Sequence, residues 1–442
     1  METKNLPSAC PLDCPDHCSL DVTLEREAPS VPWRVATVDG DERNPLTAGA
    51  ICGKVRGMSS RVHSDERITT PMRRVGGTKA LGSYPGDFEP VSWDEALELS
   101  AARLGEVHRE HGGEAILPIS YGGSNGALTD GVFDERLWRR LGATQLARTL
   151  CAAPGGAAAA GLVGKMPGVH LVDYEHAELI VLWGVNPKDS GMHLLPVLKR
   201  AVAAGAKTIV IDPRSTSVAR GADLHLAPRP GTDLCLALAL INQLFDRGWV
   251  DADFLEQHTN GADRLKRKAI DWSLERASKE TGVAVTDMQR FLELFHHAEP
   301  AVVRMGWGVE RNRNGGSACS AILALPLIAG KFNGPRGGRG GGFTASMSRA
   351  LPIDRQPAIG AAPVATREVN INHVGVALCA GGDGADLIPG STLSPCVRAA
   401  FVYNCNPAST LPNQAAVQRG LAREDLFTVV SEQVATDTCH FA

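Results

Sequence analysis

Four cysteines near the beginning of the chain have the residue type and the spacing of a metal site. Cys10, Cys14 and Cys18 follow one another at intervals of four residues among Pro and Asp, and Cys52 stands 34 positions after Cys18. Four thiolates can bind a tetrahedral zinc ion or an iron–sulfur cluster. Structural zinc sites usually use two closely spaced pairs, whereas three ligands in one loop and a distant fourth suit the four iron corners of a cubane. The pattern therefore favours a 4Fe-4S cluster, and a zinc knuckle or buried thiols are the alternatives.

The composition is that of a globular protein with more than one domain. The 442 residues are too many for one hydrophobic core. The net charge of −4 comes from interspersed charges of both signs, which favours neither nucleic acid nor a membrane surface as a partner. No apolar run reaches the roughly 18 residues of a membrane span, and the first residues lack a signal pattern. We expect a cytoplasmic protein, whose eleven cysteines are ligands or buried thiols rather than disulfides.

Two segments of the chain repeat one strand–turn–helix unit with an offset of 220 residues. IVLWGVNP (180–187) aligns without a gap with AFVYNCNP (400–407), and KTIVID (207–212) aligns with FTVVSE (427–432). Short apolar runs of this kind are typical of buried parallel strands. The first copy predicts strands at 178–183, 207–211 and 223–226, and a helix at 193–204. Two copies imply two related α/β sheets and two related ligands.

The segment PVSWDEALELSAARLGEVHREHGG (90–113) predicts a helix. Ser92 and Glu95 form a capping box at its start, and the two glycines stop it. Trp93, Leu97, Ala101 and Leu104 fall on one stripe, which is expected to be the buried face. An apolar run, AILPIS (115–120), follows and leads into a glycine-rich loop. A helix followed by a strand that ends in such a loop is typical of α/β proteins, which bind ligands at these strand ends.

The cysteine segment and the residues around Cys52 resemble those of a known family. CPLDCPDHCSL (10–20) followed by ICGK (51–54) resembles the cluster-binding segment of the molybdopterin oxidoreductases. These bis(molybdopterin guanine dinucleotide) enzymes include formate dehydrogenases, nitrate reductases and dimethyl sulfoxide reductases, and the likeness extends over essentially the whole chain. It implies a 4Fe-4S cluster on the four cysteines named above. It also implies that Lys54 lies between the cluster and a pterin and helps electrons to pass.

The resemblance also accounts for the repeat, because these enzymes hold two pterin dinucleotides on two homologous α/β domains around one metal. WGVNP (183–187), IDPRST (211–216) and APRPGTD (227–233) resemble one dinucleotide site, and YNCNP (403–407) resembles the pterin loop of the other. The cofactor-binding residues that the resemblance implies are Gly184, Asn186, Pro187, Asp212, Arg214, Arg229, Gly231, Thr232, Asp233, Asn404 and Asn406. Each loop alone could be an ordinary strand-to-helix turn, and their order along the chain supports the assignment. The glycine-rich tract at 330–343 is expected to pack on a pterin, with Arg336 or Arg339 near phosphate, rather than to bind RNA.

Cys151 stands in ARTLCAAPGGAAAAGLVG (147–164), just before a run of small residues. Small residues leave room for a bulky cofactor, and a helix N-terminus favours a thiolate. The resemblance implies that Cys151 ligates molybdenum, or tungsten, together with the pterin sulfurs. A buried cysteine without this role is the alternative. Formate dehydrogenases usually carry a histidine after this ligand, and the presence of Ala152 here argues against formate as substrate.

The expected architecture is α/β, with a small N-terminal 4Fe-4S domain and two homologous Rossmann-like domains. The cluster domain covers 1–67, a central dinucleotide-binding domain covers 149–331, and a discontinuous α/β domain combines 68–148 with 332–442. The expected function is a two-electron oxidation or reduction of a small-molecule substrate, with single electrons passing through the cluster to or from a partner protein. A non-catalytic electron-carrying or assembly subunit is the alternative. We expect no nucleic-acid or membrane partner.

The two copies of the repeat differ in how they continue. Ala442 aligns with Ala222, after which the first copy runs on through DLHLAPRPGTD (223–233). Family members continue from this point into a further strand and a C-terminal barrel domain that closes over both dinucleotides. We therefore expect a chain without the barrel domain, either as a truncated product or as one half of a split enzyme whose barrel is a separate chain.

Overall fold

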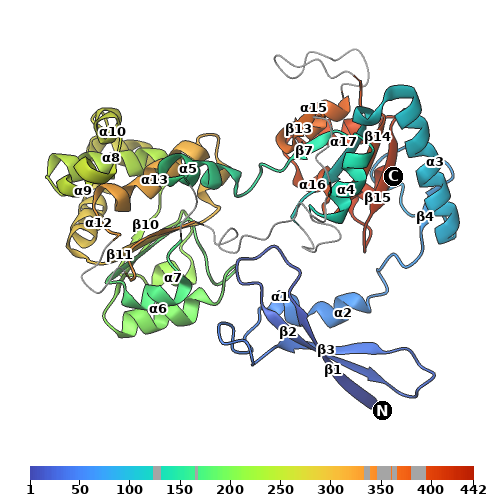
Figure 1. Ribbon diagram of the computed structural model, residues 1–442, viewed down its shortest axis with the longest axis horizontal. Helices are drawn as coiled ribbons and strands as arrows, with labels where there is room; N and C mark the ends of the chain where they lie inside the picture. Colours follow the sequence, from blue (N-terminus) through green and yellow to red (C-terminus); the bar gives the residue numbers. More distant parts are fainter. Residues whose placement is uncertain (123–130, 165–167, 333–338, 346–359, 361–365, 380–394) are drawn as a thin grey trace. The chain divides into compact units, whose positions relative to one another are not determined.

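The computed structural model describes residues 1–122, 131–164, 168–332, 339–345, 360, 366–379 and 395–442 (Figure 1). The chain divides into two compact units. The first unit consists of 1–13, 17–149 and 353–442, and the second consists of 14–16 and 150–352. No helix in the described part of the chain is long and apolar enough to span a membrane.

The first unit begins with an antiparallel sheet whose strands follow the order β1-β2-β3. The strands are β1 (Glu2–Ala9), β2 (Ser19–Arg26) and β3 (Arg34–Gly40). Ala9 pairs with Ser19, so the loop that carries the first three cysteines closes this hairpin. The helices α1 (Gly53–Arg56) and α2 (Met58–Val62) follow, and Cys52 is the N-cap of α1. The fourth cysteine is therefore held at the beginning of a helix.

The α/β part of the first unit contains a parallel sheet in the order β15-β14-β6. Its strands are β6 (Ile116–Ser120), β14 (Ala399–Tyr403) and β15 (Phe427–Ser431). The helices α3 and α4 pack on one face of this sheet through a shared core with Phe401 and Tyr403, and Figure 1 shows α16 and α17 on the side away from α3. The helices are α3 (Trp93–His111), α4 (Phe133–Arg140), α15 (Val374–Cys379), α16 (Pro407–Thr410) and α17 (Gln414–Leu421), with short 3-10 turns η1 (Gly113–Ala115), η4 (Ile371–His373) and η5 (Asp437–Phe441). Two small strand pairs complete it, β4 (Met72–Arg74) with β5 (Phe88–Pro90) and β7 (Gln145–Ala147) with β13 (Glu368–Asn370).

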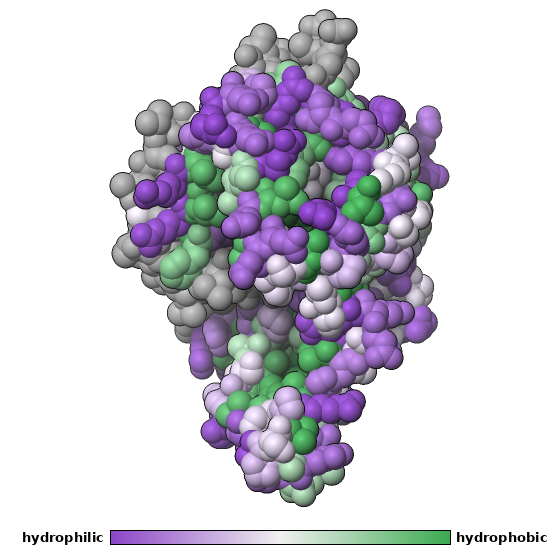
Figure 2. Space-filling view, turned by 90° about the vertical axis from the view of Figure 1, so that its right-hand side faces the viewer, coloured by the Kyte–Doolittle hydropathy of each residue, from purple (hydrophilic) through white to green (hydrophobic). Residues whose placement is uncertain are grey.

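Helix α3 confirms the predicted cap and corrects the predicted buried face. The Ser92 hydroxyl accepts a hydrogen bond from the Glu95 backbone N–H at 3.1 Å, and Gly112 ends the helix with a φ of 82°. Trp93 and Leu97 are nevertheless 67% and 61% exposed, because the helix packs on the core through Leu104 and Val107 in its later turns. Figure 2 faces the side of the molecule on which α3 lies, and apolar side chains (green) stand among hydrophilic ones on this surface.

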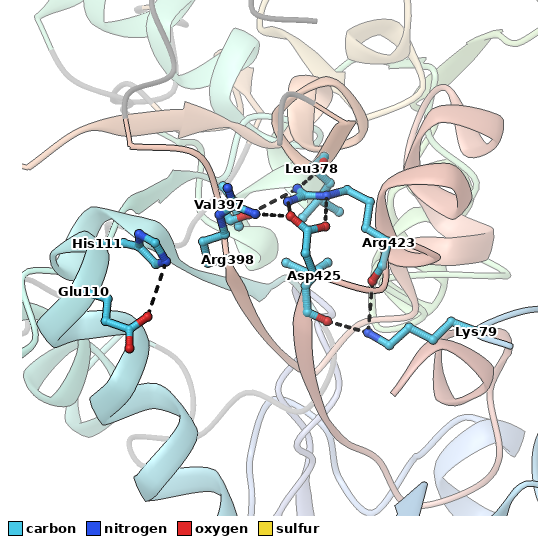
Figure 3. Close-up of polar contacts among 9 residues, drawn as sticks. Lys79, Glu110, His111, Leu378, Val397, Arg398, Arg423 and Asp425 are labelled. Atoms are coloured by element: carbon cyan, nitrogen blue, oxygen red, sulfur yellow. Dashed lines mark hydrogen bonds and ion pairs between the residues drawn. The ribbon is translucent and has the colours of Figure 1, made fainter. Parts of the chain in front are cut away.

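A polar network ties the turn between α17 and β15 to neighbouring segments (Figure 3). The Arg423 guanidinium donates to the Leu378 carbonyl at 2.6 Å and pairs with Asp425 at 2.7 Å. Lys79 donates to the carbonyl of Leu426 and is largely buried. Burial of the charged ammonium group lowers the pKa of Lys79 to about 8.

The second unit is built on a five-stranded parallel sheet in the order β10-β9-β8-β11-β12. The strands are β8 (Leu179–Trp183), β9 (Lys207–Ile211), β10 (Leu224–Leu226), β11 (Ala301–Met305) and β12 (Gly342–Thr344). The strands that the first copy of the repeat predicted are confirmed, and so is the helix α6 (Leu194–Ala203). The other helices are α5 (Ala153–Val163), α7 (Ser217–Arg220), α8 (Asp233–Asp246), α9 (Ala252–His258), α10 (Ala262–Ala269), α11 (Leu274–Thr281), α12 (Val285–His297) and α13 (Gly315–Ile328), with η2 (Leu171–His176) and η3 (Val309–Arg311).

Both faces of this sheet are covered, which explains why its strands are continuous apolar runs. Along β8, Val181 and Trp183 enter a core formed with α5, α8, α12 and α13. Ile180 and Leu182 point to the opposite face and pack with α6. All four side chains are fully buried, as expected for a parallel strand between two helical layers.

One predicted boundary is wrong. The sequence placed the end of the central domain at residue 331, but Gly342–Thr344 pairs in parallel with β11 and lies in the second unit. The strand was missed because its residues belong to a glycine-rich tract, which carries no apolar strand pattern. Much of that tract, including Arg336, lies outside the described residues, whereas Arg339 forms an ion pair with Asp173 at 3.3 Å.

The repeat of 220 residues is confirmed element by element. The strand β14 begins and ends 220 positions after β8, and β15 stands in the same relation to β9. Thr216 and Thr436 occupy matching N-cap positions of the short helical turns that follow the second strand of each copy. The strand β11 pairs with β8 on the side away from β9, and β6 pairs with β14 on the side away from β15. The three-stranded sheet β15-β14-β6 therefore has the same spatial arrangement as the strands β9-β8-β11, although its third strand comes from an earlier part of the chain.

Candidate functional site

The strand order of the second unit creates a ligand-binding position between β8 and β11. In chain order the five strands read 3-2-1-4-5, and the order reverses between these two neighbours. The loops that leave the carboxyl ends of two such strands diverge, and ligands of open α/β sheets bind in the crevice between them. The residues that follow β8 and β11 are therefore the ones to inspect.

The loops after β8 and β11 approach each other through glycine backbone. Gly184 has a φ of 64°, a conformation that side chains other than those of Gly and Asn rarely adopt. A Cβ atom on Gly306 would lie 2.3 Å from the Gly184 carbonyl oxygen, which is far closer than van der Waals contact. Glycine at both positions therefore permits this close packing at the switch point, which is the place between β8 and β11 where the strand order reverses.

Cys151 is connected to the loop after β11 by an arginine. The helix α5 begins two residues after Cys151, and its N-cap residue, Ala152, supplies no side-chain cap. Arg311, in η3, donates from Nη2 to the Cys151 Sγ atom at 3.4 Å and from Nη1 to the Leu150 carbonyl at 2.6 Å. The candidate metal ligand therefore stands at the carboxyl edge of the sheet, as its predicted role requires.

Glu310 supplies the missing cap of α5 from the same loop. Its Oε2 atom accepts a hydrogen bond from the Gly155 backbone N–H at 3.2 Å, and the residue is only 7% exposed. Burial raises the pKa of Glu310 to about 7. Sequence reasoning missed both Glu310 and Arg311. The sequence feature that could have identified them is GWGVERNRNGG (306–316). It follows an apolar strand, just as GVNP (184–187) follows β8.

The first predicted dinucleotide loop contains an unsatisfied acceptor. Asn186 Nδ2 donates to Asp189 Oδ2 at 2.7 Å, which fixes the orientation of the amide, and Asn186 Oδ1 is buried without a hydrogen-bond partner. An unpaired buried carbonyl costs about 1–3 kcal/mol, so this atom fits a site that receives a donor from a bound group. Pro187 is buried beside it.

The other residues predicted for this dinucleotide follow β9 and β10. Asp212 Oδ1 accepts from the Arg214 backbone N–H at 2.8 Å, so a tight turn holds this carboxylate at the end of β9. Farther along, Gly231 has a φ of 85°, and Thr232 is the N-cap of α8. These positions lie at the strand ends where a nucleotide would be held.

Two of the predicted side chains already have partners inside the unit. Asp233 Oδ1 accepts from the buried Trp183 indole N–H at 2.8 Å, and burial raises the pKa of this carboxyl group. The Arg229 guanidinium donates to the carbonyls of Lys279 and Glu280 at 2.8 and 3.1 Å. Asp233 therefore connects the beginning of α8 to β8, and Arg229 binds the last turn of α11. Arg229 is exposed and Asp233 is half-buried.

The second copy of the loop shares one left-handed residue with the first and has a different hydrogen-bond network. Asn404, which aligns with Gly184, has a φ of 55°. Asn406 Oδ1 accepts from the backbone N–H and the hydroxyl of Thr438, at 3.2 and 2.6 Å. The residue that aligns with Thr438 in the first copy is Val218, which has no hydroxyl. This difference explains why the carbonyl of Asn186 lacks a partner and that of Asn406 does not.

Three of the four proposed cluster cysteines, Cys10, Cys18 and Cys52, belong to or pack on a small apolar core of the first unit. Cys10 and Cys18 are 8% and 5% exposed, and the Cys10 backbone N–H donates to the Cys18 carbonyl at 2.8 Å. Cys52 packs against the same core, which also contains Leu20, Val38, Ile51 and Val55. Cys14 is half-buried in the loop between Cys10 and Cys18, and Lys54 is exposed on α1. All eleven cysteines lie among the described residues, and none is in a disulfide, so these thiols fit a soft metal cluster.

Comparisons with known proteins agree with this chemistry. The family model for molybdopterin oxidoreductase matches residues 67–442, and the model for the molybdopterin oxidoreductase Fe4S4 domain matches residues 3–64. Probable oxidoreductase YoaE of Bacillus subtilis (strain 168) is 34% identical over 98% of this chain and 60% of its own length. The assimilatory nitrate reductase catalytic subunit of the same organism is 25% identical over 97% of this chain and 60% of its own length.

A solved structure shares the fold. The acetylene hydratase from Pelobacter acetylenicus superimposes with a TM-score of 0.74 and 19% identity, over 99% of this chain and 62% of its own. This chain thus spans about 60% of the length of the relatives named here. The family models together cover nearly all of its residues. The chain belongs to the molybdopterin oxidoreductase family, and its cofactors are a 4Fe-4S cluster and molybdopterin.

Proposed function

We propose that this chain carries the metal centre and the iron–sulfur cluster of a cytoplasmic bis(molybdopterin guanine dinucleotide) oxidoreductase. The observation that carries the proposal is the duplicated loop, in which Gly184 and Asn404 share one left-handed conformation at the carboxyl ends of equivalent strands. Two such loops at corresponding strands of two parallel sheets are suited to two related ligands. Family membership supports the identity of these ligands as molybdopterin dinucleotides.

The proposed ligand sets come from the resemblance of the motifs to those of the family, and the burial of Cys10 and Cys18 and the unpaired acceptor of Asn186 support them. Cys10, Cys14, Cys18 and Cys52 hold the cluster, Lys54 lies on the electron path, and Cys151 ligates molybdenum or tungsten. The residues from Gly184 to Asp233 named above bind one dinucleotide, with Asn186 Oδ1 accepting an N–H of that ligand. Asn404 and Asn406 belong to the loop that holds the other.

The proposed reaction is a two-electron oxidation or reduction of a small-molecule substrate. When bound, the metal would supply the two-electron chemistry, and the cluster would carry electrons singly to or from a partner protein. The chain's own contribution is to bind and orient the cofactor between the loops after β8 and β11. Ala152, which follows the candidate metal ligand where formate dehydrogenases usually carry a histidine, argues against formate as substrate.

Elemental and nucleotide analysis of the anaerobically purified protein tests this proposal. We expect about four iron atoms and about one molybdenum or tungsten atom per chain, and about two guanine nucleotides released by acid for each molybdenum or tungsten atom. Iron without molybdenum, tungsten or pterin would instead indicate an electron-carrying or assembly subunit. A single zinc ion without iron would contradict the proposal altogether. A screen with a redox dye over nitrate, sulfoxides and sulfur oxyanions then addresses the substrate.

A further inference from the structure

We infer that Glu310 and Arg311 form a clamp that holds Cys151 and the first turn of α5 in position for metal ligation. The inference rests on the proposed role of Cys151 as the metal ligand. Both clamp residues belong to η3, which is separated from the end of β11 by three residues, and they bind the segment 150–155 at both of its ends. Neither contact involves a cofactor, so the clamp would operate in the protein before loading.

The arginine side of the clamp is a two-pronged contact. Arg311 reaches the Leu150 carbonyl at 2.6 Å and the Cys151 Sγ atom at 3.4 Å with different nitrogens of one guanidinium group. The planar fork of arginine is rigid, so two simultaneous hydrogen bonds fix both the backbone and the thiol.

The glutamate side of the clamp depends on a glycine. Gly155 donates its backbone N–H to Glu310 Oε2 at 3.2 Å, and a Cβ atom at this position would lie 2.7 Å from Glu310 Oε1. The first turn of α5 has no side-chain cap of its own, and a helix N-terminus leaves backbone N–H groups that need an acceptor. Glu310 therefore holds the helix that begins just after Cys151, while Arg311 holds the residues just before it.

The two contacts are rigidly coupled because η3 is itself packed against the switch point. A Cβ atom on Gly315 would come within 2.8 Å of the Glu310 carbonyl oxygen, and one on Gly184 would lie 3.1 Å from Val309 Cγ2. A change in the loop after β8 would therefore be transmitted through η3 to Cys151. The clamp residues are thus positioning residues, which act through Cys151 rather than on the substrate.

Hydrogen exchange of the cofactor-free protein tests the clamp itself. Arg311→Met should speed exchange in a peptide that spans Leu150 to Gly156 by about tenfold to a hundredfold, the factor that corresponds to losing hydrogen bonds from a charged group. Gly155→Ala should act in the same direction by displacing Glu310, and Glu310→Gln, which keeps an acceptor, should not. Arg311→Lys keeps the charge without the fork and should retain only part of the protection.

The matched control is Arg313→Met. Arg313 is exposed two residues after Arg311 and has no hydrogen bond or ion pair with a described residue. This variant removes the same side chain from the same loop, so it should leave the exchange of the 150–156 peptide unchanged. Equal effects of the two methionine variants would show that loss of charge in the loop, and not the clamp, controls α5.

The spectrum of the metal in the loaded protein tests the positioning role. Loss of a hydrogen bond to a ligating sulfur should change the electron paramagnetic resonance signal of Mo(V) in Arg311→Met and leave it unchanged in Arg313→Met. Faster exchange with an unchanged signal would overturn the positioning role, and unchanged exchange would overturn the clamp. If Cys151→Ser leaves both the metal content and the signal unchanged, Cys151 is not a ligand and the positioning role falls with it. In that case the exchange experiment alone would test whether the clamp holds the first turn of α5.

Discussion

Gly184 and Asn404, which are 220 positions apart, have left-handed backbones with φ angles of 64° and 55° at the same point of two equivalent loops. Glycine and asparagine are the two residues that most readily adopt this conformation. The shared conformation shows that the repeat preserves a backbone shape as well as a pattern of apolar residues. It also makes the two positions suitable for matched substitutions.

Gly184→Ala is expected to destabilise the second unit by about 1–2 kcal/mol, the usual cost of a left-handed backbone for a residue with a Cβ atom. The new Cβ would also lie 3.1 Å from Val309 Cγ2. Asn404→Gly should change the stability of the first unit by only a few tenths of a kcal/mol, about the difference between two tolerated residues. Denaturation curves of the three proteins compare these effects. An alanine variant as stable as the parent would contradict the steric argument.

Val218→Thr should stabilise the second unit by about 1 kcal/mol, because its hydroxyl can donate to the unsatisfied Oδ1 of Asn186. The reciprocal variant, Thr438→Val, removes the donor to Asn406 Oδ1 and the acceptor for the Ala408 N–H. It should destabilise the first unit by about 1–3 kcal/mol. Denaturant titration measures both, and a destabilising Val218→Thr would show that the two loops are not equivalent.

The stability of the first unit should rise between pH 8 and pH 10.5, and Lys79→Met should abolish this rise. Burial lowers the pKa of Lys79 from 10.5 to about 8, so the unfolded chain binds more protons than the folded chain in this interval. Stability increases with pH wherever the unfolded state binds more protons, here by at most about 3 kcal/mol. Hydrogen exchange of β15 at several pH values provides the measurement. The exposed Lys188→Met is the control, and it should keep the rise.

The opposite dependence is expected for Glu310. Burial raises the pKa of its carboxyl group from 4.5 to about 7, so the folded chain keeps a proton that the unfolded chain has released. The stability of the second unit should therefore fall as the pH rises from 4.5 to 7. Glu310→Gln should remove this fall and be more stable than the parent at pH 8, whereas the exposed Glu256→Gln should not. Chemical denaturation at pH 5 and pH 8 distinguishes the two variants.

Cys52→Ser should release the iron–sulfur cluster or leave an incomplete one, because it removes the proposed fourth ligand. Iron content and visible absorbance measure the loss. Cys235→Ser changes a thiol in α8 outside the proposed ligand set and should keep full iron content. Complete retention of iron by Cys52→Ser would remove this residue from the ligand set.

The sequence by itself determined the features that depend on neighbouring residues. The capping box of α3, the apolar strands of the two repeat copies and the strand that follows α3 each rest on a few consecutive side chains, and the structure confirms them. The internal repeat with its offset of 220 residues could also be detected in the sequence, because two copies of one local pattern can be compared without knowledge of any contact. The four-cysteine spacing belongs to the same class, since most of its ligands lie in one loop.

Only the tertiary structure decided which of these local elements lie together. The parallel sheet places β11 beside β8, and this pairing brings Arg311 to Cys151, 160 residues earlier in the chain. Packing also left Trp93 exposed on a helix whose stripe predicted burial, and it gave Gly342–Thr344 a place in the sheet, with Phe343 buried in the core. The physical reason is that residue patterns record which face of an element prefers to be buried, whereas the partner of that face depends on loop closure and on the packing of the whole unit.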